Sequence, residues 1–233
     1  MPHINKKRGN TRLEIIRLGA RLFIEEGYSC TTVNKIAKTL DLSPGNVTFY
    51  FPTKEHLLAV LVDELFDFQT WLMEYEASEG ASSLLSYCLE LTGIAAACED
   101  DEVAKDFFAS SYSSTMILNM IRENDTEKTK RVFAEYRPDW SDEEWRATEN
   151  LVSGIEFATI MTCEKETPLD KKIEKALDSI MLLYGVPEEL RKQKIEKVLA
   201  MNYRRIGQRI LQGFKEYIDR VNEENLKQSR KNK

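Results

Sequence analysis

The chain has 233 residues, of which 42% are apolar and 31% charged, a balance that excludes a disordered chain and favours one or two globular domains. No apolar run approaches the roughly 20 residues that span a bilayer. The basic N-terminus is not followed by an apolar segment, so we expect no membrane anchor, no signal peptide and a cytoplasmic protein.

Residues that bind metals or carry out catalysis are scarce. The four cysteines form no C-x-x-C pair, and the two histidines have no metal-ligand spacing. In a reduced compartment the cysteines would be small buried hydrophobes. We therefore predict no catalytic residues, no metal and no cofactor.

Charge is divided unevenly along the chain. Residues 1–60 contain nine Lys or Arg and five acids, a net charge of +4, which leaves −10 for the rest of a chain whose net charge is −6. A basic head on an acidic body suits a protein of which only the head approaches a polyanion such as DNA. The alternative is a chance scatter of charge.

Apolar residues spaced by three and four predict a first helix over residues 12–26, and Gly27 is a natural end for it. Thr31 or Thr32 can cap a second helix, whose polar side chains point outward. We expect this pair of helices to support a third.

A turn then leads to that third, short helix over residues 44–51, with Ser43 as its cap and Pro44 at its first position. Two turns are not stable alone, so this helix must pack on the two before it. The arrangement is the outline of a helix-turn-helix DNA-binding unit over about residues 32–52.

Two ungapped motifs lie in this stretch: Phe23, Gly27, Tyr28, Thr31, Thr32, Val33, Ile36 and Ala37, then Ser43, Gly45, Val47, Tyr50, Phe51, Lys54 and Leu57. They resemble the TetR family of bacterial transcriptional regulators, over about residues 12–58. The resemblance implies a DNA-binding regulator and does not identify its ligand. One position departs from the family, because Thr48 stands where a phosphate-contacting tyrosine is usual.

Exposure on the predicted helices suggests a role for each polar position. Asn46 can pair with adenine, and Phe49 can touch a thymine methyl group. The expected DNA-binding residues are Thr32, Lys35, Ser43, Pro44, Gly45, Asn46, Thr48, Phe49, Tyr50 and Lys54. Lys6, Lys7 and Arg8 form either an arm on the DNA backbone or a solvated end. For Phe51 we favour plain core packing.

From residue 54 an apolar stripe of about six turns predicts a helix that connects head and body. In the family that this sequence resembles, such a helix transmits ligand binding to the head. Gly80 ends it, and another helix follows over residues 81–98.

Aromatic and Met side chains then gather between residues 105 and 140, as they would around a small apolar or aromatic ligand or in an ordinary helical core. The candidate ligand-binding residues are Phe68, Leu72, Phe107, Phe108, Tyr112, Met116 and Glu156. Glu156 is either a buried acceptor or, as we favour, an edge position open to water.

Ser141 and Glu144 form a capping box for a helix that runs to about residue 164, and another helix follows over residues 168–184. We expect these two helices to pair with their copies in a four-helix dimer interface. The expected interface residues are Ser153, Gly154, Ala158, Ile173, Leu177 and Ile180. The segment 188–224 is predicted to be one long amphipathic helix with a frayed basic end.

The fold class is therefore all-α. A helix-turn-helix domain over residues 1–54 is joined by a long helix to a ligand-binding and dimerisation domain over residues 55–233. We expect a homodimer that reads a pseudo-palindromic operator in double-stranded DNA, most simply a repressor released by a small-molecule effector.

One alternative is a regulator of the same fold without an inducer, which a body with no cavity larger than a few waters would favour. The other is an all-α enzyme, for which the sequence offers no catalytic constellation.

Overall fold

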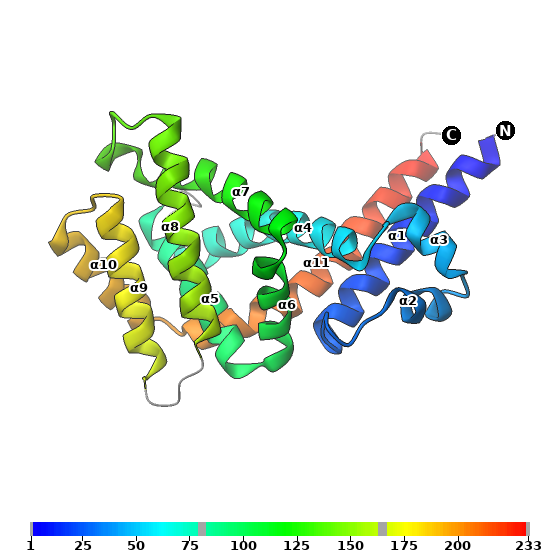
Figure 1. Ribbon diagram of the computed structural model, residues 1–233, viewed down its shortest axis with the longest axis horizontal. Helices are drawn as coiled ribbons and strands as arrows, with labels where there is room; N and C mark the ends of the chain where they lie inside the picture. Colours follow the sequence, from blue (N-terminus) through cyan, green and yellow to red (C-terminus); the bar gives the residue numbers. More distant parts are fainter. Residues whose placement is uncertain (1, 79–82, 163–166, 232–233) are drawn as a thin grey trace.

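The computed structural model describes residues 2–78, 83–162 and 167–231, with side chains from residue 11 to residue 221 of these ranges. Within them the regular elements are all helices, which confirms the all-α prediction (Figure 1). The predicted break at Gly80, as well as Cys163, lies outside the described residues.

The head consists of α1 (Pro2–Glu25), α2 (Val33–Thr39) and α3 (Pro44–Tyr50). Its core is built from Phe23, Ile36, Val47 and Phe51, all almost fully buried, so Phe51 packs as expected. Helix α1 begins ten residues before the predicted start, and the backbone of the expected basic arm is therefore helical.

Helix α4 (Lys54–Ala77) begins in the head and ends in the body. The Oγ1 atom of Thr53 accepts the His56 amide at 3.3 Å and caps its first turn. Leu57 packs against Gly19 of α1, while the Phe68 ring packs at a tilt against Phe214 near the other end of the chain. One helix therefore contributes to both hydrophobic cores.

Helix α5 (Leu84–Asp100) is the centre of the body, because nearly all of its side chains are buried. A helix that is apolar on every side must be enclosed by others. Around it lie α4, α6 (Glu102–Ser113), α8 (Asp142–Met161) and α9 (Leu169–Leu183). Helix α7 (Thr115–Phe133) and the short 3₁₀ turn η1 (Ala134–Tyr136) lead into α8.

The segment predicted as one helix over residues 188–224 is two helices, so that prediction was wrong. Helix α10 (Glu188–Ala200) ends at Met201, whose backbone is extended, and α11 runs over Tyr203–Lys231. Asn202 causes the second start, because its Oδ1 atom accepts the Arg205 amide at 3.2 Å as a cap. The apolar register continued across this break and concealed it.

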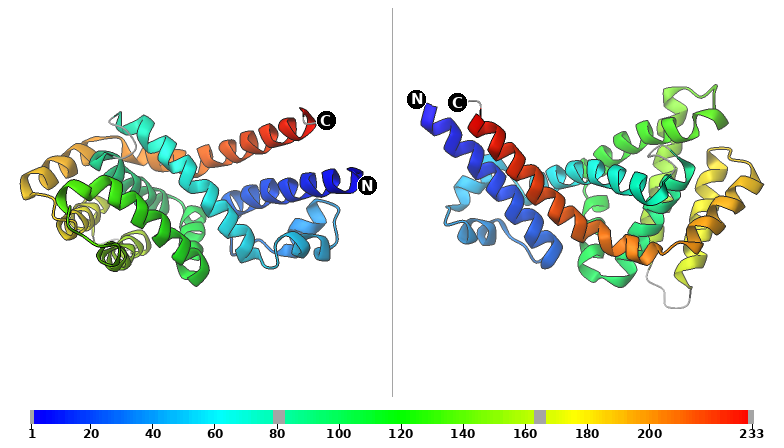
Figure 2. Two further views of the ribbon diagram at one scale, coloured as in Figure 1. Left: turned by 90° about the horizontal axis from the view of Figure 1, so that it is seen from above. Right: turned by 180° about the vertical axis from the view of Figure 1, so that it is seen from behind.

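Helix α11 turns back across the body and lies beside α1, so that both ends of the chain are at the head (Figure 2). Arg17 Nε of α1 donates to Asp219 Oδ1 of α11 at 3.0 Å, and Lys215 pairs with Glu25. The division into residues 1–54 and 55–233 therefore separates two elements that pack together. We call α11 the return helix.

The return helix crosses α5 at very close range. A Cβ at Gly207 would lie 2.7 Å from the Gly93 carbonyl oxygen and 2.9 Å from the Ala97 amide nitrogen. Both of these are backbone atoms that cannot move aside alone. The crossing therefore requires glycine at residue 207.

We expect Gly207→Ala to lower the free energy of unfolding by about 1 kcal/mol or more, because the added methyl group forces α11 away from α5. Gln208→Ala is the matched control, because Gln208 is exposed next to Gly207 on the same helix. It should stay within about 0.5 kcal/mol of the wild type. Urea denaturation measures the free energy of unfolding of both variants, and a Gly207→Ala variant as stable as Gln208→Ala would contradict the close crossing.

Candidate functional site

Helix α3 is positioned by its own cap and by one buried side chain. Ser43 Oγ accepts the Asn46 amide at 3.3 Å, Pro44 occupies the first turn, and Val47 is inserted into the head core. The remaining positions face away from the core. Six of the predicted DNA-binding residues are exposed together here: Ser43, Pro44, Gly45, Asn46, Thr48 and Phe49.

The turn between α2 and α3 fixes the angle at which α3 is presented. Asp41 has φ 54°, a left-handed conformation that Asp tolerates better than most residues. Phe49, 67% exposed, stands edge-on to the half-buried Tyr50 at 5.1 Å between ring centroids. Such a large apolar side chain on an outer face suits contact with another molecule.

Two of the predicted DNA-binding residues, Lys35 and Lys54, are engaged within the chain. Lys35 pairs with Glu26, and the Lys54 ammonium donates to the Tyr28 carbonyl oxygen at 2.7 Å. The same ammonium lies 3.9 Å from the centre of the Tyr28 ring, and partial burial lowers the pKa of Lys54. Lys54 therefore fastens α4 to the head in this structure.

Thr32 and Thr48 are exposed, although each hydroxyl group has a local role. Thr32 Oγ1 accepts the Lys35 amide at 3.1 Å, and Thr48 donates to the Gly45 carbonyl oxygen at 3.3 Å.

Lys38, which the sequence prediction left out of the site, is exposed on α2. The outward position of Lys38 in the predicted helical pattern could have identified it as a candidate DNA-binding residue. Cys30, expected to be buried, is exposed.

The loop after α1 joins the head to the body. Gly27 has φ 94°, which only glycine adopts readily. This conformation lets the Ser29 amide donate to Asp106 Oδ2 of α6 at 2.8 Å, and the Ser29 hydroxyl group also binds that carboxylate. A second contact joins Glu55 of α4 to Ser114, the cap of α7. Sequence reasoning missed both contacts, which join residues far apart in the chain.

The structure divides the candidate ligand residues between two places. Phe107, Phe108 and Tyr112 line a cavity of about 40 Å³ between α4, α6 and α7, and Tyr112 and Glu156 line a neighbouring cavity of about 30 Å³. Met116 packs on the core without lining either cavity.

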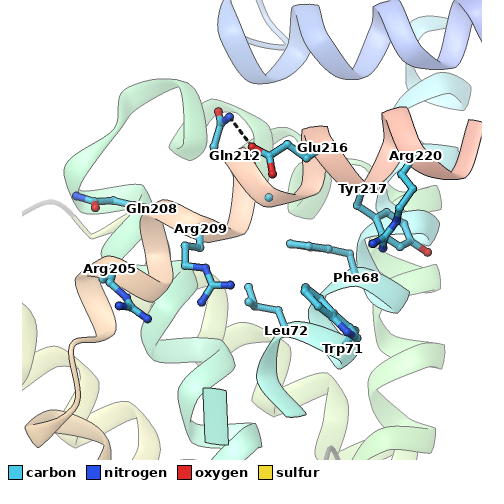
Figure 3. Close-up of a pocket in the computed structure, with 11 residues that line it drawn as sticks. Phe68, Trp71, Leu72, Arg205, Gln208, Arg209, Gln212, Glu216, Tyr217 and Arg220 are labelled. Carbon is cyan, nitrogen blue, oxygen red and sulfur yellow. Dashed lines mark hydrogen bonds between the residues drawn. The ribbon is translucent and has the colours of Figure 1, made fainter. Parts of the chain in front are cut away.

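Phe68 and Leu72 instead line a groove of about 660 Å³ between α4 and the return helix (Figure 3). Trp71 of α4 also borders this groove, and Arg205, Arg209 and Arg220 reach it from α11. Arg205 and Arg209 are paired with Glu76, so the Glu76 carboxylate offsets part of the positive charge beside the aromatic side chains of this groove.

Glu156 is not at an edge open to water, because only 9% of it is exposed. Tyr112 and Tyr87 donate to its two oxygens at 3.2 and 3.4 Å. Asp125 and Glu149 lie beside it, and burial raises the pKa of all three carboxyl groups, with repulsion between neighbouring acids acting in the same direction. The sequence prediction of a water-facing glutamate was wrong, since the two tyrosines and Asp125 arrive from other helices.

Four of the six expected interface residues are buried within the chain. Ile173, Leu177 and Ile180 are fully buried in the core of the body, and Ser153 is buried against Arg122. The apolar pattern on α9 that we assigned to an interface therefore marks the side of that helix that faces the core of the body. Gly154 and Ala158 are exposed on α8, where exposed Leu151 and Phe157 flank them.

A capped short helix with an exposed polar and aromatic face, set on two supporting helices by a tight turn, defines a helix-turn-helix DNA-binding domain. Residues 15–61 match the family described as bacterial regulatory proteins, tetR family. Over this domain the chain is similar to the TetR family.

Curated relatives align with the chain over short stretches. The chain is 33% identical to the uncharacterized HTH-type transcriptional regulator YuxN of Bacillus subtilis strain 168 over 78 residues, 34% of this chain and 27% of that protein. It is 35% identical to the HTH-type transcriptional regulator QacR of Staphylococcus aureus strain Mu50 over 54 residues, 23% and 29% of the two chains. It thus spans about a third or less of these relatives, all named as regulators.

Two solved structures are similar in outline. A gamma-butyrolactone receptor (ArpA-like protein) is 17% identical, with 88% of this chain and 99% of that chain covered and a TM-score of 0.45. Salmonella enterica GusR is 18% identical, with coverages of 80% and 95% and a TM-score of 0.44. Among the residues described here, no helix combines the length and the apolar character needed to cross a membrane.

We expect Lys54→Met to destabilise the head by about 1–2 kcal/mol, because it removes a charged hydrogen bond and a cation–π contact while keeping the stem. Lys38→Met, on the exposed face of α2, is the control and should stay within about 0.5 kcal/mol of the wild type. Hydrogen exchange of amides in residues 28–58 reports the local stability. Equal protection in the two variants would refute the fastening role of Lys54.

Proposed function

We propose that this chain is a transcriptional regulator that binds operator DNA as a homodimer and acts as a repressor. The observation that supports it best is the exposed face of α3, which presents Asn46, Thr48 and Phe49 with no covering element among the described residues. These side chains offer an amide for a base edge, a hydroxyl group and an apolar ring. Two such heads on a two-fold axis would read half-sites about 34–36 Å apart or a multiple of that.

The exposed face of α8 is the surface that supports dimerisation. Leu151 is 62% exposed and Phe157 39% exposed, and between them Gly154 and Ala158 leave room for a close approach. Leu182 of the neighbouring helix α9 is exposed as well. This apolar face replaces the buried α9 positions expected from the sequence, and a second copy of the chain would cover it.

A small apolar or aromatic effector would enter the body at Phe107, Phe108 and Tyr112, beside α4. The two cavities there, of about 40 and 30 Å³, are far below the roughly 300 Å³ of a ligand pocket. Entry would therefore have to part α4 from α6 and α7, and α4 carries the head. That requirement would couple effector binding to DNA binding.

The small volumes of these two cavities, as distinct from the open groove at Phe68 and Leu72, favour a second candidate function, a DNA-binding regulator of this fold without a small-molecule inducer. The two candidates differ in one measurement. A released repressor binds its effector and its operator with reciprocal antagonism, so each weakens the other by the same factor. An inducer-free regulator leaves operator affinity unchanged for every compound that binds the body.

We expect the chain to select a pseudo-palindromic site from a random DNA pool, with an affinity that falls steeply between low and high salt. Asn46→Ala should then lose about 1–3 kcal/mol at one base pair in each half-site and little at the others. Lys38→Ala is the comparison, because Lys38 is an exposed cation on α2 whose contact would be with phosphate, and its loss would weaken binding equally on all sequences. Fluorescence anisotropy on single-base variants of the site measures both, and a sequence-blind loss in Asn46→Ala would disprove its contact with a base.

Leu151→Glu should convert the dimer to monomers, because the introduced carboxylates would be buried close together across the two-fold axis. We expect dimerisation to weaken at least about a hundredfold. Gln208→Glu, an exposed change on α11, should leave the dimer intact. Sedimentation velocity distinguishes the two, and a Leu151→Glu dimer of wild-type affinity would rule out the α8 face.

A further inference from the structure

The interior between α5, α7 and α8 holds more acid than base. Glu90, Asp125, Glu149 and Glu156 bring four carboxyl groups together, and Lys128 is the ammonium among them. Lys128 forms its ion pair with Glu90. Among the side chains that the structure describes, no ion pair reaches the other three acids, whose contacts are hydrogen bonds from Tyr87, Tyr112, Tyr184 and Asn124.

The three unpaired acids converge on one point. One carboxylate oxygen from each of Asp125, Glu149 and Glu156 lies within 4.8 Å of the others. Two oxygens on opposite sides of a cation that binds them at about 2.0–2.6 Å are about 4–5 Å apart. A single cation between them can therefore reach all three carboxylates without moving a helix.

One oxygen in this cluster is left without a partner. Glu149 is 1% exposed, and its Oε2 atom accepts the Tyr184 hydroxyl group at 2.9 Å, while Oε1 has no hydrogen-bond donor in the described structure. A buried acceptor without a partner is costly, and a buried carboxylate without a counter-charge is more so. Next to the cluster, the 4% exposed Gln69 also has an unpaired Nε2 atom, in the cavity that Asp125 lines.

We propose that Asp125, Glu149 and Glu156 bind one divalent metal cation of the hard, oxygen-preferring class, Mg²⁺, Mn²⁺ or Ca²⁺. The donors are carboxylate oxygens with the Tyr87 and Tyr112 hydroxyl groups beside them, and the cluster contributes no imidazole or thiolate that would favour Zn²⁺ or Cu²⁺.

The space available limits the ligand to a small cation. The adjoining cavities, of about 30 and 40 Å³, admit an ion with one or two waters but not an organic cation of drug size. A bound ion would join α7 to α8, with α4 next to it through Gln69 and Phe66. This site does not depend on the proposed repression, because it concerns binding by the body alone.

The test is titration of the full chain, first treated with a chelator, with MnCl₂, MgCl₂ or CaCl₂ in a calorimeter, with the EPR signal of free Mn²⁺ as a second measure. We expect one ion per chain. Glu149→Gln and Glu156→Gln each keep the side-chain size, remove one charge and should weaken binding at least about tenfold. Glu143→Gln, exposed on the same helix, should bind as the wild type does.

A spectroscopic signature locates the ion. Tb³⁺, which binds oxygen sites as Ca²⁺ does, should emit when tyrosine is excited, because Tyr87 and Tyr112 touch Glu156. Glu156→Gln should abolish this emission, and Asp125→Asn provides a half-buried substitution if a Glu variant fails to fold. Failure of all these metals to bind at millimolar concentration, or unchanged binding in the variants, would overturn the proposal. Stabilisation by benzyltrimethylammonium but by no metal would overturn it too.

Discussion

Helix α4 belongs to two hydrophobic cores at once, and the position of the head depends on this sharing. Its first turns pack on α1 through Leu57 and Gly19, and its later turns pack on the body and on α11 through Phe68. Because a helix of this length is stiff along its axis, α3 can be reoriented only if α4 shifts in the body or repacks against α1. The orientation of the exposed face of α3 is therefore set by packing far from it.

The return helix adds a second constraint of the same kind. It packs on α5 at Gly207 and on α1 through Arg17 and Asp219, so the head is held to the body along two routes. The loop contact between Ser29 and Asp106 is a third. The exposed ion pairs contribute little individually, whereas the backbone crossing at Gly207 cannot adjust by small steps. A conformational change in the body can therefore move the head only if it breaks these contacts together or is small enough to leave them intact.

Local signals in the sequence predicted the head well. The caps Thr32, Ser43 and Thr53 each bond the amide three residues on, and the short helix predicted over residues 44–51 ends one residue before the predicted end. The body was predicted less well, since the same apolar periodicity marks a helix face whether its partner lies in the same chain or in another. Ile173, Leu177 and Ile180 show this, because they are buried in the core of the body while Leu151 is exposed on α8.

The acid cluster shows a further limit of sequence reasoning. Asp125 on α7 is separated from Glu149 and Glu156 on α8 by more than twenty residues, and the two glutamates alone, seven apart, mark one face of a helix and nothing more. Only the packing of α7 on α8 brings the three carboxyl groups together, and the buried Tyr87 and Tyr184 are among the side chains that separate them from water. Charge that each helix could carry harmlessly at a surface thus becomes concentrated inside the body. Metal sites of His and Cys can be recognised from residue spacing along the chain, whereas this candidate site is formed only where two helices meet.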